Sequence, residues 1–258
     1  MKLWRSLRRG KGRAETGLFL AEGPNLLAEL VESAVLVRQV LCAPYATDDA
    51  KVARLLLRCE AAGIPCERLR ETEFGRLADV VSPQGVLAVA EIPARGWDDL
   101  RKPRVLLLDE VQDPGNLGTL VRTAEALGLG GVVALDGTAD PWNPKAVRAA
   151  AGSSLRLPVF RSSRAEAVAR LNERSIRLWC ADPAGEPFRR GAVAPRRLAL
   201  ALGNEARGVS ESLVRASERC VSVPMAGRVE SLNVAIAGAV LLDRMFETDV
   251  GTREAKGR

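Results

Sequence analysis

Histidine is absent from the 258 residues of the chain. This absence excludes every mechanism that needs an imidazole as base, nucleophile partner or metal ligand, including a Ser-His-Asp triad and a His-rich metal centre. The five cysteines are odd in number, widely spaced and without a Cys-x-x-Cys pair, which argues against a disulfide framework and against a zinc site. Any catalysis must therefore come from other side chains.

Long apolar runs are also missing. No segment approaches the roughly 18 apolar residues that span a bilayer, and no apolar stretch with a cleavage site follows the basic N-terminus. The sequence therefore predicts a soluble cytoplasmic protein. Aromatic residues make up only 4% of the chain, so no stacking platform for single-stranded bases is evident.

Positive charge is concentrated at the N-terminus. The formal net charge is +6. A cluster of basic residues at a terminus is typical of contact with nucleic-acid phosphates, and the alternative is a solvated terminal helix. The basic residues of the cluster are Lys2, Arg5, Arg8, Arg9, Lys11 and Arg13.

The hydrophobic pattern predicts two units joined by a linker. Residues 17–33 favour a strand and then a helix, followed by a strand at 35–42, a helix at 48–62 and a strand at 86–90. The following stretch contains Pro93, Gly96 and Pro103 and has no sustained period, as expected of a linker. The predicted division is an N-terminal α/β domain at 1–92, a linker at 93–103, a second domain at 104–247 and a polar tail at 248–258.

The second unit alternates strands and helices regularly. Near-continuous apolar strands separated by helices predict a parallel sheet covered on both faces. Ligands bind such sheets at the carboxyl ends of the strands, which directs attention to the loops after residues 111, 203 and 224. The expected strands are 105–111, 131–135, 155–160, 176–181, 198–203 and 220–224, and the expected helices are 116–127, 144–151, 164–174, 210–218 and 231–246.

Two glycine-rich segments are candidates for phosphate binding. Gly128, Gly130 and Gly131 follow a helix, whereas the dinucleotide fingerprint follows a strand and opens a helix, so they predict a helix C-cap and turn. The segment 113–124 does lie between strand and helix, but it lacks the Gly-Lys-Ser/Thr ending of a P-loop. Hydrolysis of a nucleoside triphosphate is therefore not expected.

Three loops carry polar groups of another kind. If Asn116 opens its helix, Arg122 lies less than two turns further on and both can face one crevice; the alternative is an N-cap and a surface arginine. Glu205 follows a strand and can meet a ligand amine, hold an arginine or serve as a turn residue. Ser231 and Asn233 open a helix that is apolar nearly all round, which must be buried in the domain or against another subunit; both residues could instead be caps only. Small residues and few polar groups suit an adenosine-bearing cofactor without a pyrophosphate.

The same loops resemble a known family. LDEVQDPGNLGTLVRTAEALG, LALGNEARGVS and VSVPMAGRVESLNVAIAGAVLLDRM are similar, in order and spacing, to the three signature motifs of the SpoU (TrmH-like) RNA ribose 2′-O-methyltransferases of the SPOUT superfamily. RRGKGRAETGLFLAEG and SPQGVLAVA are similar to the start and end of the RNA-binding accessory domain often fused to them. The resemblance covers nearly the whole chain.

This resemblance implies a fold, an activity and partners. The fold is α/β, with a small RNA-binding domain followed by a parallel-sheet domain that ends in a trefoil knot and forms a homodimer. The activity is methyl transfer from S-adenosylmethionine to a ribose 2′-hydroxyl, with ribosomal RNA favoured over transfer RNA as partner, and with no metal and no membrane. The residues that match catalytic positions are Arg122, Asn116, Glu205, Ser231 and Asn233, and those that match positions around the cofactor are Gly203, Val223, Met225 and Leu232.

The arginine is the family's usual candidate for the base. A guanidinium stays protonated, with a pKa above about 12, so we expect Arg122 to clamp a substrate phosphate and to polarise the 2′-hydroxyl together with it. Asn116 is expected to orient Arg122 or the ribose, and Glu205 to hold Arg122 or a neighbour. Two alternatives stay open: a knotted methyltransferase that acts on a base nitrogen, and a non-catalytic RNA-binding scaffold.

Overall fold

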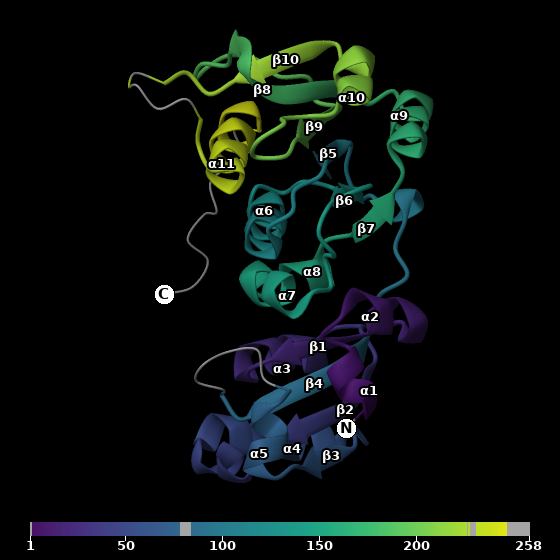
Figure 1. Ribbon diagram of the computed structural model, residues 1–258, viewed down its shortest axis with the longest axis vertical. Coiled ribbons are helices and arrows are strands. Elements are labelled where there is room, and N and C mark those ends of the chain that lie inside the picture. Colours follow the sequence, from purple (N-terminus) through teal and green to yellow (C-terminus); the bar gives the residue numbers. More distant parts are fainter. Residues whose placement is uncertain (1, 78–83, 226, 228–230, 247–258) are drawn as a thin grey trace, which may run out of the picture.

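The computed structural model describes residues 2–77, 84–225, 227 and 231–246. Two α/β units lie one above the other, and each is built around its own β-sheet (Figure 1). No helix in the described part of the chain is long and apolar enough to cross a membrane. The predicted polar tail at 248–258 lies outside the described residues.

The N-terminal unit holds a four-stranded sheet in the order β1-β4-β2-β3. The strands and helices expected within 17–33, 35–42, 48–62 and 86–90 are confirmed. The pattern missed the short elements, because three to seven residues hold too few turns or alternations to show a period. The elements are α1 (Lys2–Ser6), α2 (Gly10–Thr16), β1 (Leu18–Glu22), α3 (Pro24–Glu32), β2 (Val37–Cys42), η1 (Pro44–Asp48), α4 (Ala50–Ala61), β3 (Cys66–Arg68), α5 (Glu71–Gly75) and β4 (Val86–Glu91).

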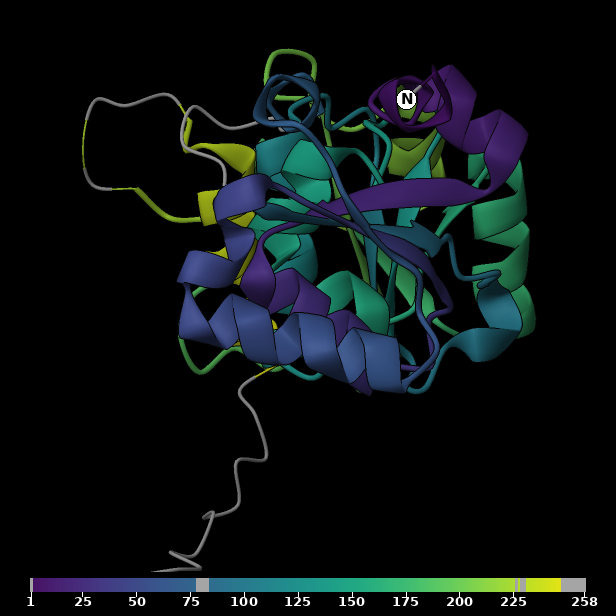
Figure 2. The same cartoon turned by 90° about the horizontal axis from the view of Figure 1, so that it is seen from below.

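Alternation along these strands divides their side chains between two buried clusters. Leu20 and Leu87 lie in one cluster with Leu7, which follows α1, and with Phe74 of α5. Phe19 lies in the other cluster, whose members come from α3, from α4 and from the second unit. Figure 2 shows α1, beside the mark for the N-terminus, and the long helix α4 on opposite sides of this sheet. The two faces of the sheet are thus covered by different helices.

The second unit is built around six parallel strands in the order β10-β8-β9-β5-β6-β7. The predicted parallel sheet is therefore confirmed. Strand β7 starts later than expected because a short helix occupies part of the predicted strand, and β8 runs further than expected. The elements are η2 (Trp97–Asp99), β5 (Arg104–Leu108), α6 (Pro114–Ala126), β6 (Gly131–Leu135), α7 (Pro144–Ala150), α8 (Ser153–Arg156), β7 (Val159–Ser162), α9 (Arg164–Glu173), β8 (Arg177–Pro187), β9 (Leu198–Leu202), α10 (Glu211–Ala216), β10 (Arg219–Ser222) and α11 (Val234–Met245).

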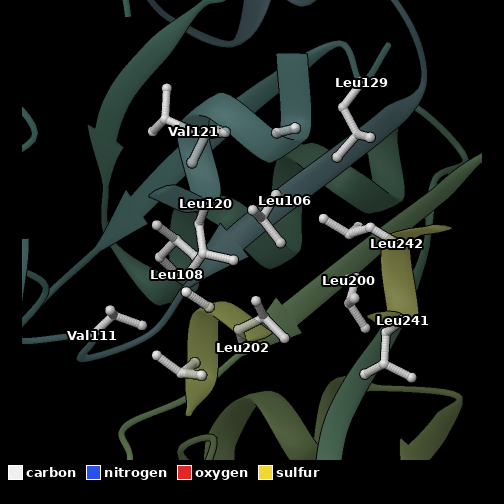
Figure 3. Close-up of a cluster of buried hydrophobic side chains, with 14 of the residues drawn as sticks. Leu106, Leu108, Val111, Leu120, Val121, Leu129, Leu200, Leu202, Leu241 and Leu242 are labelled. Atoms are coloured by element: carbon white, nitrogen blue, oxygen red, sulfur yellow. The ribbon is translucent and has the colours of Figure 1, made fainter. Parts of the chain in front are cut away.

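Helices cover both faces of the parallel sheet, as expected. On one face, Leu106 of β5 and Leu200 of β9 lie in a buried cluster with Leu120 of α6 and Leu242 of α11 (Figure 3). On the other face, a second cluster joins alternate strand residues to α9 and α10. The turn after α6 contains Gly128 with a φ of 70°, which confirms the predicted C-terminal turn at these glycines.

Helix α11 departs from its prediction in two ways. It begins at Val234, so Ser231 precedes it and Asn233 is its N-cap. One face is buried, and a Cβ on Gly238 would lie only 2.6 Å from the side chains of Leu120 and Leu202. The other face is open, since Ile236 is 54% exposed. Of the two expected modes of burial, complete burial inside the domain is therefore wrong, and burial against another subunit stays a prediction.

Polar and aromatic contacts join the two units. Arg13 of α2 is only 2% exposed. Its guanidinium donates to Asp140 at 2.7 Å and to the carbonyl of Leu7 at 2.8 Å. The rings of Phe19 and Trp142 lie 4.8 Å apart across the same contact. Arg13 thus docks the units onto each other, so for this member of the basic cluster both alternatives, phosphate contact and a solvated helix, are wrong.

A second ionic bridge runs through Arg156 of α8. It forms ion pairs with Glu29 of α3 and with Glu125 of α6. Burial alone would raise the pKa of Glu125, but the hydrogen bonds from Arg156 and Ser153 outweigh burial and lower it. The charged carboxylate therefore ties α6 to α8, which in turn contacts the N-terminal unit.

We expect the Asp140→Ala substitution to lower the free energy of unfolding by about 3 kcal/mol, because it leaves the buried Arg13 charge without its carboxylate partner. Denaturant unfolding measures the change. The Asp98→Ala substitution is the control: the Asp98 side chain is 92% exposed beside Arg174, and its loss should cost less than about 1 kcal/mol. Equal effects of the two substitutions would contradict a structural role for Arg13.

Candidate active site

A cavity of about 350 Å³ opens where the loops after β9 and β10 meet α11. This volume lies within the range of about 300–1,000 Å³ that is typical of ligand pockets. Because the strands are parallel, their carboxyl ends share one edge, and the expected gathering of loops at that edge is confirmed. The walls come from residues 181–184, 202–208, 221–223 and 225, and from Ser231, Leu232, Val234, Ala237 and Leu241.

The loop after β9 is held in a tight turn. Asn204 and Gly208 form an antiparallel bridge through backbone hydrogen bonds of 3.0 and 2.8 Å. The Asn204 side-chain oxygen also accepts from the backbone nitrogen of Ala206 at 2.9 Å. A Cβ on Gly203 would overlap the backbone of Gly208 and of Val209, so only glycine allows this approach. The turn places Glu205 on the wall of the cavity.

Two acidic residues that directly follow β5 hold this turn in place. Asp109 is fully buried and accepts a hydrogen bond from Arg164 at 2.7 Å. Glu110 has a φ of 58°, which is rare for a residue with a side chain. Its carboxylate pairs with Arg164 and Arg207, and its carbonyl accepts from Asn204 at 3.1 Å. The sequence pattern did not predict this anchor, although two consecutive acidic residues at the end of an apolar strand were its signal.

A chain of hydrogen bonds connects the three motifs. The Asn116 amide nitrogen donates to Glu205 at 2.9 Å, and the Asn116 amide oxygen accepts from Asn233 at 3.1 Å. Asn233 also caps α11 through its oxygen, which accepts from Ala235 at 2.9 Å. Each of these two amides donates through its nitrogen and accepts through its oxygen, so each is fixed in one orientation.

Asn116 does not open α6 as expected. Asp113 is the N-cap and accepts from the backbone nitrogen of Asn116 at 2.8 Å. Its carboxylate also accepts from Lys145 at 2.6 Å. The hydrogen bond from Lys145, followed by that from Asn116, lowers the pKa of Asp113. Because Asp113 takes the capping role, the Asn116 side chain is left available for Glu205.

Arg122 is exposed on α6. Its guanidinium makes no hydrogen bond or ion pair with any residue in the described part of the chain. Glu205 was expected to hold either Arg122 or a neighbouring residue. It accepts a hydrogen bond from Asn116 and none from Arg122. An exposed guanidinium that has no partner among the described residues, on the helix that also carries Asn116, is suited to an anionic ligand.

The residues expected around a cofactor all line the cavity: Gly203, Val223, Met225 and Leu232, together with Ser231 and Glu205. Asn116, Asn233 and Arg122 lie outside its lining. The mainly apolar and backbone walls fit an adenosine-bearing group, which needs flat apolar contact and few hydrogen bonds. No group of three or more acidic or cysteine side chains in the described residues could hold a metal ion.

One wall of the cavity was not expected. β8 and β10 pair at Cys180 and Cys220, and the next pair joins Glu186 to Val221, so residues 181–185 form a bulge. This bulge supplies Asp182 and its neighbours to the cavity, and Asp182 accepts from the backbone of Ala184 at 2.7 Å. The sequence pattern stopped the strand at residue 181 and gave no sign that pairing resumed after a bulge.

Fold and cavity together define an α/β protein that binds a small ligand at the carboxyl edge of a parallel sheet. The family model described as the SpoU rRNA Methylase family matches residues 103–243, and the one described as MRM3-like substrate binding domain matches residues 1–88. The chain belongs to the SpoU rRNA methylase family, and the resemblance noted in the sequence is confirmed.

Known relatives extend over nearly the whole chain. The 23S rRNA (guanosine(2553)-2′-O)-methyltransferase RlmP of Bacillus subtilis is 37% identical over 94% of this chain and 94% of its own. The SpoU methyltransferase AviRb of Streptomyces viridochromogenes, solved with AdoMet, has a TM-score of 0.83 and 28% identity, covering 98% of each chain. An AdoMet-bound rRNA methyltransferase of Sinorhizobium meliloti has a TM-score of 0.81 and 28% identity over 94% and 92% of the two chains. Both structures hold the cofactor that the sequence predicts.

Proposed function

We propose that the protein transfers a methyl group from S-adenosylmethionine to a ribose 2′-hydroxyl of ribosomal RNA. The observation that carries the proposal is the hydrogen-bonded chain Glu205–Asn116–Asn233, which joins the three motifs beside the cavity. RlmP, named for this reaction, is similar to the chain over nearly its full length.

S-adenosylmethionine, when bound, supplies a methyl group on a positively charged sulfur. The protein must place the 2′-oxygen in line with that methyl group and must help to remove a proton from a poorly acidic hydroxyl. Gly203, Val223, Met225 and Leu232 form the cofactor's wall, and the tight turn of Asn204 and Gly208 keeps that wall in place.

Arg122 carries the catalytic charge in this proposal. Its guanidinium has no carboxylate partner in the described residues, so it clamps a substrate phosphate bidentately and polarises the 2′-hydroxyl with it. Asn116 positions the ribose, since its amide is fixed between Glu205 and Asn233. Ser231, on the cavity wall, supplies a hydroxyl that can donate to the substrate.

The organisation of the chain is proposed with the function. The N-terminal domain spans 1–92 and binds the RNA, residues 93–103 connect it to the catalytic domain at 104–247, and the catalytic domain ends in a trefoil knot. Two copies pair through the catalytic domain; the open, apolar face of α11 around Ile236, which is 54% exposed, supports this pairing. Because the proposed substrate is ribosomal RNA, we also propose a cytoplasmic location.

The substrate class can be tested with transcripts that carry no modifications. The protein is incubated with methyl-labelled S-adenosylmethionine and, in separate reactions, with a large-subunit ribosomal RNA transcript and with a pool of transfer RNA transcripts. We expect label in the ribosomal RNA alone. Label confined to transfer RNA would contradict the proposed substrate, and a failure of the protein to bind S-adenosylmethionine would favour the non-catalytic scaffold.

A further inference from the structure

A second concave surface lies on the N-terminal unit and is lined by residues at and next to α1, α2 and α5. It encloses about 1020 Å³ and has no aromatic or large apolar residue among the residues that line it. We call it the basic groove. The basic residues that line it are Arg5, Arg8, Arg9, Lys11, Arg70 and Arg76, against two acidic residues, Glu15 and Glu73.

The walls of the basic groove are fixed by packing. Beneath them, Leu7 and Phe74 are at most 1% exposed and share one buried cluster. Arg8 donates from one wall to the carbonyl of Arg76 on the other at 3.2 Å. A Cβ on Gly12 would overlap the backbone of Ser6, so α1 and α2 are packed as closely as glycine allows. The groove is therefore a built surface of the fold.

Both acidic residues of the groove are already engaged. Glu73 accepts from the Arg70 guanidinium at 2.7 Å, and this hydrogen bond is the main cause that lowers its pKa to about 2. Glu15 lies 3.8 Å from Lys11. Three other cations keep their charge unneutralised, since the side chains of Arg5, Arg9 and Arg76 are exposed and make no ion pair within the described residues. The result is a concave surface on which these three guanidinium groups are exposed to solvent.

The chemistry of the groove selects its ligand. Guanidinium groups match the geometry of phosphate oxygens and bind them bidentately. Without aromatic side chains the groove cannot stack bases, and contacts to phosphate position a nucleic acid without reading its sequence. An acidic peptide would find no apolar anchor among the lining residues. The ligand that fits is the phosphodiester backbone of an RNA.

We propose that the basic groove binds the phosphodiester backbone of the RNA substrate at a site separate from the candidate active site. The inference rests on the proposed function, because it takes RNA as the substrate. Helix α2 gives the groove a fixed relation to the catalytic unit: Lys11 lines the groove, and Arg13, two residues on, is buried against Asp140. The groove thus sets the distance along the RNA between the phosphates that it holds and the ribose that reacts.

The test removes the three unneutralised charges with the combined Arg5→Ala, Arg9→Ala and Arg76→Ala substitutions. The matched control removes three charges from α4, on the opposite face of the same sheet, with Lys51→Ala, Arg54→Ala and Arg58→Ala. Binding to a short fluorescein-labelled RNA duplex of arbitrary sequence is followed by anisotropy over a range of salt concentrations. The KM for the ribosomal RNA transcript and the kcat are measured in parallel, and thermal unfolding verifies that both variants fold.

For the groove variant we expect the KM for RNA to rise at least tenfold and the slope of log Kd against log salt to fall by about 2–3, since each of the three lost phosphate contacts removes about 0.7–0.9. Its kcat at saturating RNA and its affinity for S-adenosylmethionine should stay unchanged. An unchanged KM and salt slope, or an equal effect of the α4 control, would overturn the proposal. The proposal would also be overturned if the groove variant lost binding to phosphatidylserine vesicles but still bound RNA like the wild type. That result would assign the groove to a membrane surface.

Failure of the proposed function gives a different result. If the wild-type protein methylates no RNA but its binding to the duplex still depends on Arg5, Arg9 and Arg76, the groove is upheld and the enzymatic proposal is wrong. If methylation proceeds normally and the groove variant keeps the wild-type KM, the enzymatic proposal is upheld and the groove is overturned.

Discussion

The Arg122→Ala substitution is expected to abolish methyl transfer and to leave the binding of S-adenosylmethionine intact. Arg122 is exposed on α6 and does not line the cavity, so its removal does not alter the cofactor wall. The loss of a charged group that acts on the reacting oxygen should lower kcat by roughly 1,000-fold. Single-turnover transfer with labelled cofactor measures the rate, and isothermal titration calorimetry measures the affinity for the cofactor.

Two further variants sharpen this experiment. Arg122→Lys keeps the charge but loses the planar fork, so partial activity is expected if the group clamps a phosphate bidentately. Arg215→Ala serves as the control, because the Arg215 side chain on α10 is 71% exposed and, within the described residues, pairs only with Glu211 at 3.3 Å; its activity should match the wild type. Near-normal turnover of Arg122→Ala would remove Arg122 from the catalytic site.

The Gly203→Ala substitution is expected to have the largest effect on cofactor binding. The added Cβ would overlap the backbone of Gly208 and Val209, and neither can move unless the Asn204–Gly208 bridge opens. Strain of this kind costs about 1–3 kcal/mol, so the Kd for S-adenosylmethionine should rise between about fivefold and 150-fold. The rise in melting temperature that the cofactor gives the wild-type protein should be reduced accordingly.

Gly96→Ala is the matched control for this prediction. A Cβ on Gly96 would meet nothing within 4 Å, and Gly96 has an extended backbone that any residue adopts. This variant should bind the cofactor as the wild type does. If Gly203→Ala bound S-adenosylmethionine with unchanged affinity, the turn after β9 would not belong to the cofactor site.

The architecture of the second unit could be predicted because its signal is strong. Strands β6 and β9 are buried along their whole length and β5 is buried after Arg104, and all three stand in the sequence as apolar runs between helices. Runs of this kind leave few alternatives to a covered parallel sheet. The loops that follow β5, β9 and β10 then had to share one edge, which is where the cavity lies.

What could not be predicted depends on contacts between residues far apart in the chain. The bond from Asn116 to Glu205 spans 89 positions, and no local pattern separates that use of an asparagine from an N-cap. Arg13 stands among solvent-facing cations in the sequence, and only the fold shows that Asp140, 127 positions away, receives it. The bulge at 181–185 was missed because a strand that resumes after a bulge looks, in sequence, like a strand that has ended.

The chemical identity of the methylated product tests the central claim most directly. Ribosomal RNA labelled by the protein with methyl-labelled S-adenosylmethionine is digested to nucleosides, and the labelled nucleoside is identified. We expect a 2′-O-methylnucleoside, and we expect no transfer to the same RNA when its target nucleotide carries a 2′-deoxyribose. A base-methylated nucleoside, formed equally well on the deoxy-substituted RNA, would contradict ribose methylation and assign the protein to base-nitrogen chemistry.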